Sequence, residues 1–210
     1  MRVIIPAAGK SIRFGGVLKE LLPISAIKTP LEQAVDNALT GLHADSVVII
    51  TNAEKIGAHT AHVSKSALYS SVDYRIQVGH ELWSAIKTGL EATDGALVLP
   101  DTVTCINSAH IPDAPIVFGV FKTTEASRFS VIANDTIYTK QRLDGVQRAW
   151  GIVLWNSEVA QYWLEHNYVH YDDAFRAAMN EYGYKTFDLP YYYDFGTFSA
   201  YAQYLKETTL

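Results

Sequence analysis

The sequence has almost no cysteine, no long apolar run and no surplus of positive charge. Its single cysteine, Cys105, excludes an internal disulfide framework and a zinc site built from cysteines. Its apolar runs are far shorter than the roughly 18 residues that a membrane-spanning helix needs, so no membrane partner is expected. Acidic side chains outnumber basic ones by 22 to 17, which argues against nucleic acid as a partner, because phosphate backbones are bound through clustered Lys and Arg.

The N-terminal segment also lacks the pattern of a signal peptide. The apolar run from Val3 to Ala8 is short and passes directly into Gly9 and Lys10 without a cleavage-site pattern. The expected location is therefore cytoplasmic. With 210 residues, 49% of them hydrophobic, the chain fits one full-sized α/β domain or two small ones and is too apolar for a disordered segment.

Short apolar runs alternate with helical patterns in the first half of the chain. Strands are predicted at 3–5, 47–50, 74–77 and 96–99, with helices between them at about 30–41, 54–64 and 82–90. This alternation implies a parallel sheet covered by helices on both faces, that is, an α/β protein with a three-layer α/β/α, Rossmann-like fold.

Strand-like pieces become denser after Asp101. They lie at 116–121, 129–133, 136–138 and 150–155, and are followed by helices near 157–166 and 171–182, a strand near 184–189 and a helix near 197–206. The central sheet is therefore expected to be mostly parallel but mixed. Because no linker or repeat interrupts the pattern, we predict a single domain over 1–210, with a front half (1–101) and a back half (102–210).

A loop of small residues follows the first strand and is accompanied by two cations. Residues 5–16 are Ile-Pro-Ala-Ala-Gly-Lys-Ser-Ile-Arg-Phe-Gly-Gly, and Lys19 opens Lys-Glu-Leu-Leu-Pro. Successive N–H groups of such a loop can point at phosphate oxygens, and Arg13 is a forked donor suited to polyphosphate. An ordinary turn with solvated cations is the alternative. The loop matches neither the P-loop pattern nor Gly-x-Gly-x-x-Gly, which disfavours P-loop NTPases and dinucleotide dehydrogenases.

Two aspartates are candidate metal ligands. Asp101 directly follows the fourth predicted strand, and open α/β sheets bind ligands at the carboxyl ends of their strands. A carboxylate there suits Mg²⁺, which binds through one or two carboxylates plus substrate phosphates. A helix cap or turn is the alternative for Asp101, as a turn is for Asp194, which lies in Tyr193-Asp194-Phe195-Gly196-Thr197.

The segment from Val3 to Ile24 resembles the signature of the sugar-phosphate nucleotidylyltransferases, in which an Ala-Ala-Gly-x-Gly-x-Arg loop precedes Pro-Lys-x-Leu-Leu-Pro. The matching residues are Ala7, Ala8, Gly9, Arg13, Phe14, Lys19, Leu21, Leu22 and Pro23. Ser11 replaces the second glycine, and Leu18 replaces the proline. The late Asp-x-Gly-Thr and the strand Trp150-Gly151-Ile152-Val153-Leu154-Trp155 also resemble the family, so the resemblance spans essentially the whole chain.

The resemblance implies transfer of a nucleotidyl group from an NTP to a sugar 1-phosphate, with release of pyrophosphate. It implies that the front half binds nucleotide and the back half binds the acceptor. The metal ligands for Mg²⁺ are then Asp101 and Asp194. The catalytic cations are then Arg13, Lys19 and Lys140. The expected nucleotide-binding residues are Ala7, Ala8, Gly9, Ser11, Gln77 and Gly79, and the expected acceptor-binding residues are Gly151 and Tyr193.

Two of these assignments rest on partial matches. Lys140 falls where the family has Glu-Lys-Pro or Asp-Lys-Pro, but Thr139 and Gln141 depart from that pattern, and Lys122 competes for the role. Gln77 and Gly79 precede the third helix, where the family places base-recognition residues. The expected nucleotide is dTTP or UTP, with thymidylyl transfer favoured by the Trp-Gly strand, and a homodimer is expected because dimers are common in such enzymes.

Two other functions stay open. One is cytidylyl transfer to a non-sugar phosphate such as phosphocholine, because ten of the 13 tyrosines fall between Tyr162 and Tyr204, and an aromatic cage binds quaternary ammonium. The other is a catalytically weak nucleotide-sugar-binding homologue, motivated by the departures at Ser11, Leu18 and Thr139. The histidines and the single cysteine are interpreted as structural residues.

The histidines and the cysteine carry no convincing motif. The pairs His166 with His170 and His59 with His62 lack a third metal ligand at a suitable spacing, so all four are predicted to be surface residues. Cys105 has no evident base partner and is predicted to be a small buried hydrophobe.

Overall fold

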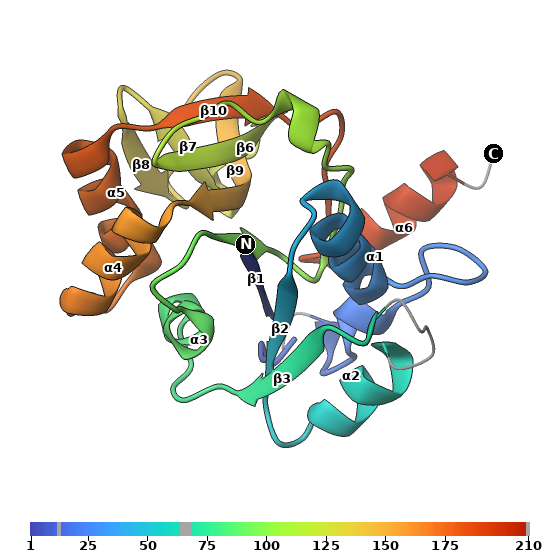
Figure 1. Cartoon of the computed structure of the whole chain (residues 1–210). Helices are drawn as coiled ribbons and strands as arrows, with labels where there is room; N and C mark the ends of the chain where they lie inside the picture. Colours follow the sequence, from blue (N-terminus) through green and yellow to red (C-terminus); the bar gives the residue numbers. More distant parts are fainter. Residues whose placement is uncertain (12–13, 64–68, 209–210) are drawn as a thin grey trace.

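The computed structural model describes residues 1–11, 14–63 and 69–208 (Figure 1). Its central sheet has the strand order β10-β6-β9-β4-β1-β2-β3, and the hairpin β7–β8 is attached through β9. The strands of this sheet are β1 (Arg2–Pro6), β2 (Ser46–Thr51), β3 (Val72–Ile76), β4 (Gly95–Val98), β6 (Ile116–Thr123), β7 (Ser130–Ala133), β8 (Thr136–Thr139), β9 (Gln147–Trp155) and β10 (Lys185–Asp188).

The parallel front of the sheet consists of β1, β2, β3 and β4, as the alternation of apolar runs and helices predicts. These strands are continuous apolar runs because both faces are covered; Val3, Ile4 and Ile5 are at most 1% exposed. The strand β9 runs antiparallel to both β4 and β6, so it joins the two halves of the chain in one sheet. Among the strands described in this sheet, only β8 and β9 run against the others.

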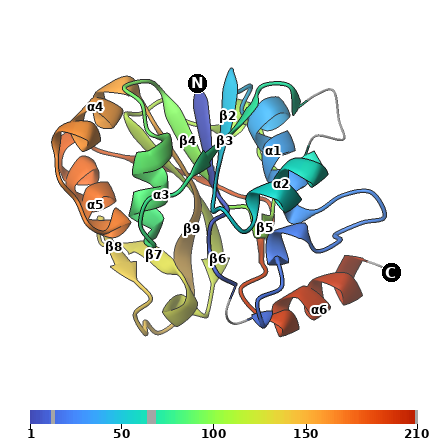
Figure 2. The same cartoon turned by 90° about the horizontal axis from the view of Figure 1, so that it is seen from below.

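Helices cover both faces of the sheet, which confirms the three-layer α/β/α fold (Figure 2). One layer holds α3 (Leu82–Gly89), α4 (Ser157–Glu165) and α5 (Tyr171–Tyr182). The other holds α1 (Pro30–Asp36), its π-helical continuation (Asn37–Gly41) and α2 (Ile56–Val63). The start of α1 is fixed by a capping box, in which Thr29 and Glu32 bind each other's backbone N–H groups and Pro30 occupies the first turn.

The last helix, α6 (Phe198–Thr208), packs on a separate small apolar cluster. The hydroxyl of Tyr201 donates to the carbonyl of Pro23 at 2.7 Å, and that of Tyr204 donates to the carbonyl of Ile24 at 3.3 Å. The segment that follows Lys19 is therefore held by the end of the chain. These two tyrosines of the late aromatic cluster serve packing and anchoring.

Several short elements carry no periodic signal and were not predicted. They are the two-residue strands β5 (Thr102–Val103) and β11 (Tyr193–Asp194), which pair antiparallel outside the main sheet, and the 3-10 turns Lys19–Leu21, Ser108–His110 and Ala126–Arg128. Within the ranges described, no helix combines the length and apolar character needed to cross a membrane.

Gly151 lies at a β-bulge in β9. The register changes from Gly119 opposite Ile152 to Val120 opposite Trp150, so Gly151 is the extra residue. A Cβ at this position would lie 2.3 Å from the ring of Tyr192. The glycine thus allows that ring to lie against the sheet, where it stacks on Phe121 with ring centroids 4.0 Å apart.

We expect Gly151→Ala to lower the free energy of unfolding by about 1–3 kcal/mol, because the added methyl group displaces the Tyr192 ring. Urea denaturation followed by circular dichroism measures this change. Gly57→Ala on α2 is the matched control, since a Cβ there meets nothing within 4 Å. The control is expected to match or exceed the native stability, because alanine favours a helix more than glycine does. Native stability of the Gly151→Ala variant would show that the ring moves away without cost.

Candidate functional site

The structure brings Asp101 and Asp194 together, although they are far apart in the sequence. The pairing of β5 with β11 sets Asp194 opposite Thr102, and the N–H of Phe195 donates to the carbonyl of Asp101 at 2.9 Å. Burial, and then the negative charge of Asp101, raise the pKa of Asp194 above its usual value. The two carboxylates therefore interact electrostatically at the carboxyl end of β4.

Each carboxylate has its own cation. The ammonium of Lys19 forms an ion pair with Asp101. The guanidinium of Arg128 donates to Asp194 Oδ1 at 3.1 Å and to Glu125 Oε2 at 2.6 Å. Lys19 was expected at this site, whereas Arg128 was missed because it lies on a single 3-10 turn with no motif around it.

The carboxylate pair fits a Mg²⁺ ion on the chemistry of its donors. Two hard oxygen donors lie close enough for the charge of Asp101, after burial, to raise the pKa of Asp194, and a divalent cation relieves such repulsion. Among the residues described, no group of three or more His, Cys, Asp or Glu side chains is placed to hold a metal ion. Such an ion would therefore need further oxygen ligands from phosphates or water.

The loop after β1 is held by its carbonyl groups. The amide of Asn52 donates to the carbonyl of Ala8 at 2.9 Å, and the ammonium of Lys55 donates to the carbonyls of Ala7 and Gly9. In a trans peptide the N–H points opposite to the preceding C=O, and the chain contains no cis bond among the residues described. The N–H groups of residues 8, 9 and 10 consequently point away from the protein interior, as an anion-binding loop requires.

Ser11 occupies a conformation that favours glycine. Its φ of +51° lies in the left-handed region, and its carbonyl accepts hydrogen bonds from the N–H groups of Phe14 and Gly16. This geometry explains why the family resembled by the sequence has a glycine at this position. Arg13 lies outside the described residues, so its catalytic role stays a prediction.

The predicted acceptor residues lie around Tyr192. Gly151 faces the ring of Tyr192, so any contribution to acceptor binding acts through that ring. The pKa of the Tyr192 hydroxyl is raised well above its usual value by burial and then by the charges of Asp194 and Asp101. Tyr192 and Tyr193 line a cavity of about 250 Å³ together with Phe121, Lys122, Thr123, Glu125, Arg128, Phe129, Asp194, Ala200 and Gln203.

Lys140 is exposed at the end of β8, in a left-handed turn with a φ of +50°. The neighbouring Thr139 donates its hydroxyl to Asp172 Oδ2 at 2.8 Å. Asp172, from α5, thus places a carboxylate beside the position where the resembled family has an acid. This residue was missed because it lies 33 positions from Thr139.

Gln77 and Gly79 form a tight turn before α3. The Gln77 amide donates to the carbonyl of Glu81 at 3.0 Å and to the hydroxyl of Ser84 at 2.7 Å. Gly79 has a φ of +94°, and a Cβ there would lie 3.1 Å from the Ser84 hydroxyl. The side chain of Gln77 is therefore fixed at the entrance to α3, and its role in base recognition stays a prediction.

Two structural interpretations of single residues were wrong. His59 was predicted at the surface, but it is fully buried, with Nε2 3.0 Å from Glu20 Oε1 and Nδ1 2.9 Å from Thr51 Oγ1. Its polar neighbours come from other elements, so local spacing gave no sign of them. Cys105 was predicted to be buried, but it is exposed because it follows β5 in a surface connection.

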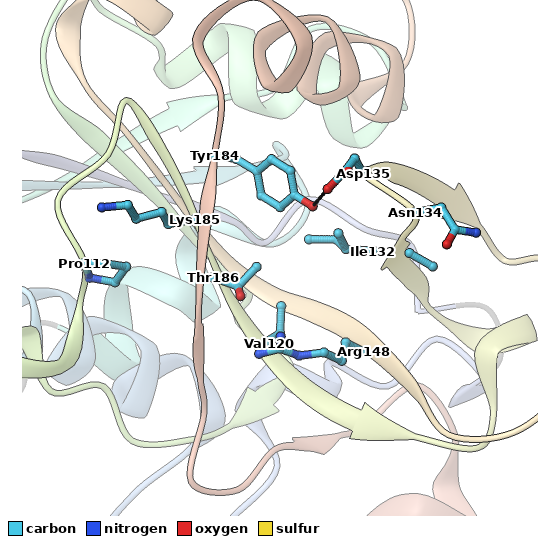
Figure 3. Close-up of a pocket in the computed structure, with 10 residues that line it drawn as sticks. Pro112, Val120, Ile132, Asn134, Asp135, Arg148, Tyr184, Lys185 and Thr186 are labelled. Carbon is cyan, nitrogen blue, oxygen red and sulfur yellow. Dashed lines mark hydrogen bonds between the residues drawn. The ribbon is translucent and has the colours of Figure 1, made fainter.

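A second cavity, of about 460 Å³, lies between β10 and the β7–β8 turn (Figure 3). Three of its polar side chains donate hydrogen bonds to protein partners. Tyr184 donates to Asp135 at 2.9 Å, Lys185 donates to the carbonyl of Asp113 at 3.0 Å, and Arg148 donates to Asp188 at 2.7 Å. This cavity shares no lining residue with the carboxylate site, so it is not the candidate centre.

Solved structures with the same arrangement of elements include proteins named as sugar-phosphate nucleotidyltransferases. A provisionally named glucose-1-phosphate thymidylyltransferase from Bacillus anthracis, in complex with a sucrose, superposes with a TM-score of 0.81 at 19% identity, covering 99% of this chain and 94% of that one. The chain has a sugar-phosphate nucleotidylyltransferase-like fold. The fold predicted from the sequence is thereby confirmed.

Two further neighbours have the same fold. A UDP-glucose pyrophosphorylase complexed with UDP-glucose has a TM-score of 0.75 at 18% identity, covering 99% of this chain and 98% of that one. HddC from Yersinia pseudotuberculosis, also solved with GMP-PN, has a TM-score of 0.70 at 15% identity, with 98% of each chain covered. No family model and no curated protein matches the sequence.

Asp194→Asn is expected to raise the melting temperature at pH 7 in metal-free buffer. A carboxyl whose pKa is raised by folding holds its proton more tightly in the folded state, so ionisation above that pKa destabilises the fold. Asparagine keeps an acceptor for the N–H of Gly196 and for Arg128 but carries no charge.

The gain should shrink as the pH falls through the raised pKa of the native carboxyl, and it should vanish below about 4, where the carboxyl is neutral in both the folded and the unfolded state. Scanning calorimetry at several pH values measures it, with the exposed Asp73→Asn as control. A lower melting temperature of Asp194→Asn at pH 7 would contradict a pKa of Asp194 that burial and the charge of Asp101 raise.

Proposed function

We propose that this protein transfers a nucleotidyl group from an NTP, dTTP or UTP, to a sugar 1-phosphate, giving an NDP-sugar and pyrophosphate. The observation that carries the proposal is the meeting of Asp101 and Asp194 at the carboxyl end of β4, close to a loop whose N–H groups point outward. Lys19 joins the two features, because it follows that loop and pairs with Asp101.

On the nucleotide side, the N–H groups of residues 8–10 bind phosphate oxygens, and Lys19 neutralises charge on the triphosphate. Gln77, with its amide nitrogen held by Glu81 and Ser84, presents its carbonyl oxygen to an N–H group of the base. Arg13 follows the same loop and stabilises the charge that develops on pyrophosphate. These roles assign the front half of the chain to the nucleotide.

The proposed reaction is an in-line displacement. A phosphate oxygen of the acceptor forms a bond to the α-phosphorus, while the bond from that phosphorus to the oxygen bridging α and β breaks and pyrophosphate leaves with the electron pair. The attacking oxygen is already ionised near neutral pH, so no general base is needed. Catalysis then comes from positioning and from charge neutralisation.

Asp101 and Asp194 would hold a Mg²⁺ ion, which neutralises phosphate charge when bound. Lys19 and Arg128, which pair with these carboxylates, would each neutralise charge on a phosphate group bound beside them. Arg128 lies on the side of the cavity that Tyr193 lines, so we assign it to the acceptor phosphate.

On the acceptor side, Lys140 and the Thr139–Asp172 pair recognise the phosphate and the hydroxyl groups of the sugar. A carboxylate accepts hydrogen bonds from sugar hydroxyls, and Asp172 supplies one although Thr139 does not. Tyr193 provides an apolar wall next to Asp194.

Cytidylyl transfer to phosphocholine is the second candidate. It is favoured by the four aromatic residues of the cavity beside Asp194, namely Phe121, Phe129, Tyr192 and Tyr193. Against it, the guanidinium of Arg128 lies 5.2 Å from the centre of the Phe129 ring and repels a quaternary ammonium there. The sugar phosphate is therefore preferred as the acceptor.

A coupled pyrophosphate assay tests the proposal. Five NTPs are combined with a panel of sugar 1-phosphates and with phosphocholine, each with Mg²⁺ and with EDTA. We expect Mg²⁺-dependent pyrophosphate release with dTTP or UTP and at least one sugar 1-phosphate. Release with CTP and phosphocholine alone would favour the second candidate, and the absence of release in every combination would refute the enzyme function.

Asp101→Asn is expected to lower kcat by at least about 100-fold, the scale of a lost group that stabilises developing charge. The variant loses a metal ligand and the partner of Lys19 together. Asp188→Asn is the control, because Asp188 is exposed and pairs with Arg148 away from the site. Native turnover of Asp101→Asn would rule out the metal assignment.

Asp172→Asn is expected to raise the KM for the sugar 1-phosphate about tenfold while the KM for the NTP stays unchanged, since a hydrogen bond to a charged acceptor is lost. Asp173→Asn is the matched control on the next residue, because Asp173 pairs with the same Arg176 but points to solvent. An equal effect of both substitutions on the acceptor KM would assign the change to α5 as a whole.

A further inference from the structure

A cluster of charged side chains is buried behind the loop that follows β1. Glu20 is 2% exposed, Lys55 is 6% exposed and His59 is fully buried. Lys and Glu are almost never buried unless they are paired, and no step of the proposed reaction uses these three residues. They come from the turn that carries Lys19 and from the beginning of α2.

The ammonium of Lys55 has an acceptor for each of its three donors. It contacts Glu20 Oε1 at 2.8 Å, the carbonyl of Ala7 at 3.4 Å and the carbonyl of Gly9. Glu20 Oε1 also accepts a hydrogen bond from His59 Nε2, at a distance of 3.0 Å. Burial raises the pKa of Glu20, but the hydrogen bonds with His59 and Lys55 lower it by more, so the net shift is downward. The carboxyl is therefore ionised, and its charge balances that of the ammonium.

The contacts of Lys55 determine which way the loop faces. With the carbonyls of Ala7 and Gly9 turned to the ammonium, the N–H groups of Ala8 and Lys10 must point to the opposite side of the loop. Without that ammonium, these carbonyl oxygens are free to turn outward, where they would repel a phosphate.

The same cluster also sets the direction of Lys19. Glu20 turns inward to Lys55 and His59, whereas the adjacent Lys19 turns to Asp101. One buried ion pair thus connects the loop, the candidate catalytic lysine and α2.

We propose that Lys55 is a positioning residue for nucleotide binding: its buried ammonium holds the carbonyls of Ala7 and Gly9 inward, so that the loop offers N–H groups to the phosphates of an NTP. Glu20 compensates the charge of Lys55 and keeps the ammonium from reaching the phosphates itself. This proposal rests on the proposed function, in that the bound anion is the triphosphate.

The competing explanation is that Lys55 serves only as the counter-ion of Glu20. Removing one partner of a buried pair is destabilising, whereas removing both charges is often neutral. The single variant Lys55→Met and the double variant Lys55→Met with Glu20→Gln separate the two explanations. Glutamine keeps an oxygen acceptor for His59, so the double variant removes the charges and little else.

The experiment measures the binding of UTP and of dTTP by calorimetry with Mg²⁺ present. It also measures kcat and the KM values for the NTP and for the acceptor in the pyrophosphate assay, and the melting temperature of each variant. Lys87→Met, an exposed lysine on α3, is the control. We expect Lys55→Met to weaken NTP binding at least tenfold and to lower the melting temperature, with the acceptor KM unchanged within twofold.

The double variant decides the question. We expect it to recover most of the melting temperature while NTP binding stays weak by at least tenfold, and Lys55→Arg to restore part of the binding. If the double variant regains native NTP affinity, Lys55 is only a counter-ion and the proposal is overturned. A native chain that binds an NTP without releasing pyrophosphate refutes the proposed function alone, because the binding comparison still decides the role of Lys55. A native chain that binds neither NTP refutes both.

Discussion

Two like charges held against each other are the constraint around which this site is organised. Main-chain pairing between β5 and β11 brings the backbone of Asp194 close to that of Asp101. Their repulsion has to be balanced by positive charge, and Lys19 and Arg128 supply it from two different parts of the chain. A divalent cation would balance it as well.

A second ion cluster supports the first from the interior. Lys55 and Glu20 have their contacts with the backbone of the loop after β1 and with His59, and neither is open to solvent. The cations that pair with the two aspartates, Lys19 and Arg128, are therefore distinct from the buried pair Lys55 and Glu20. The net charge of −5 is compatible with an anionic ligand, because only a few local cations and backbone N–H groups are required.

Much of the fold was predictable from the sequence, because short apolar runs and helical periodicity report burial directly. The parallel front of the sheet, the start of α1 at Pro30 and the helices α4 and α5 follow from such patterns. The partners that complete the site were not predictable in the same way. Arg128, Asp172 and Lys55 reach the site through tertiary contacts, and β5 and β11 are too short to carry a period. The buried His59 was misjudged for the same reason.

The clamp between α6 and the segment after Lys19 has a consequence for the order of synthesis. Asp101, the loop and Lys19 emerge from the ribosome before Asp194 and the two tyrosines, Tyr201 and Tyr204, that hold Pro23 and Ile24. The front half can therefore complete its strands while its site is still missing one carboxylate and its anchor. Pairing of the two aspartates therefore waits until segments from both halves of the chain have been synthesised.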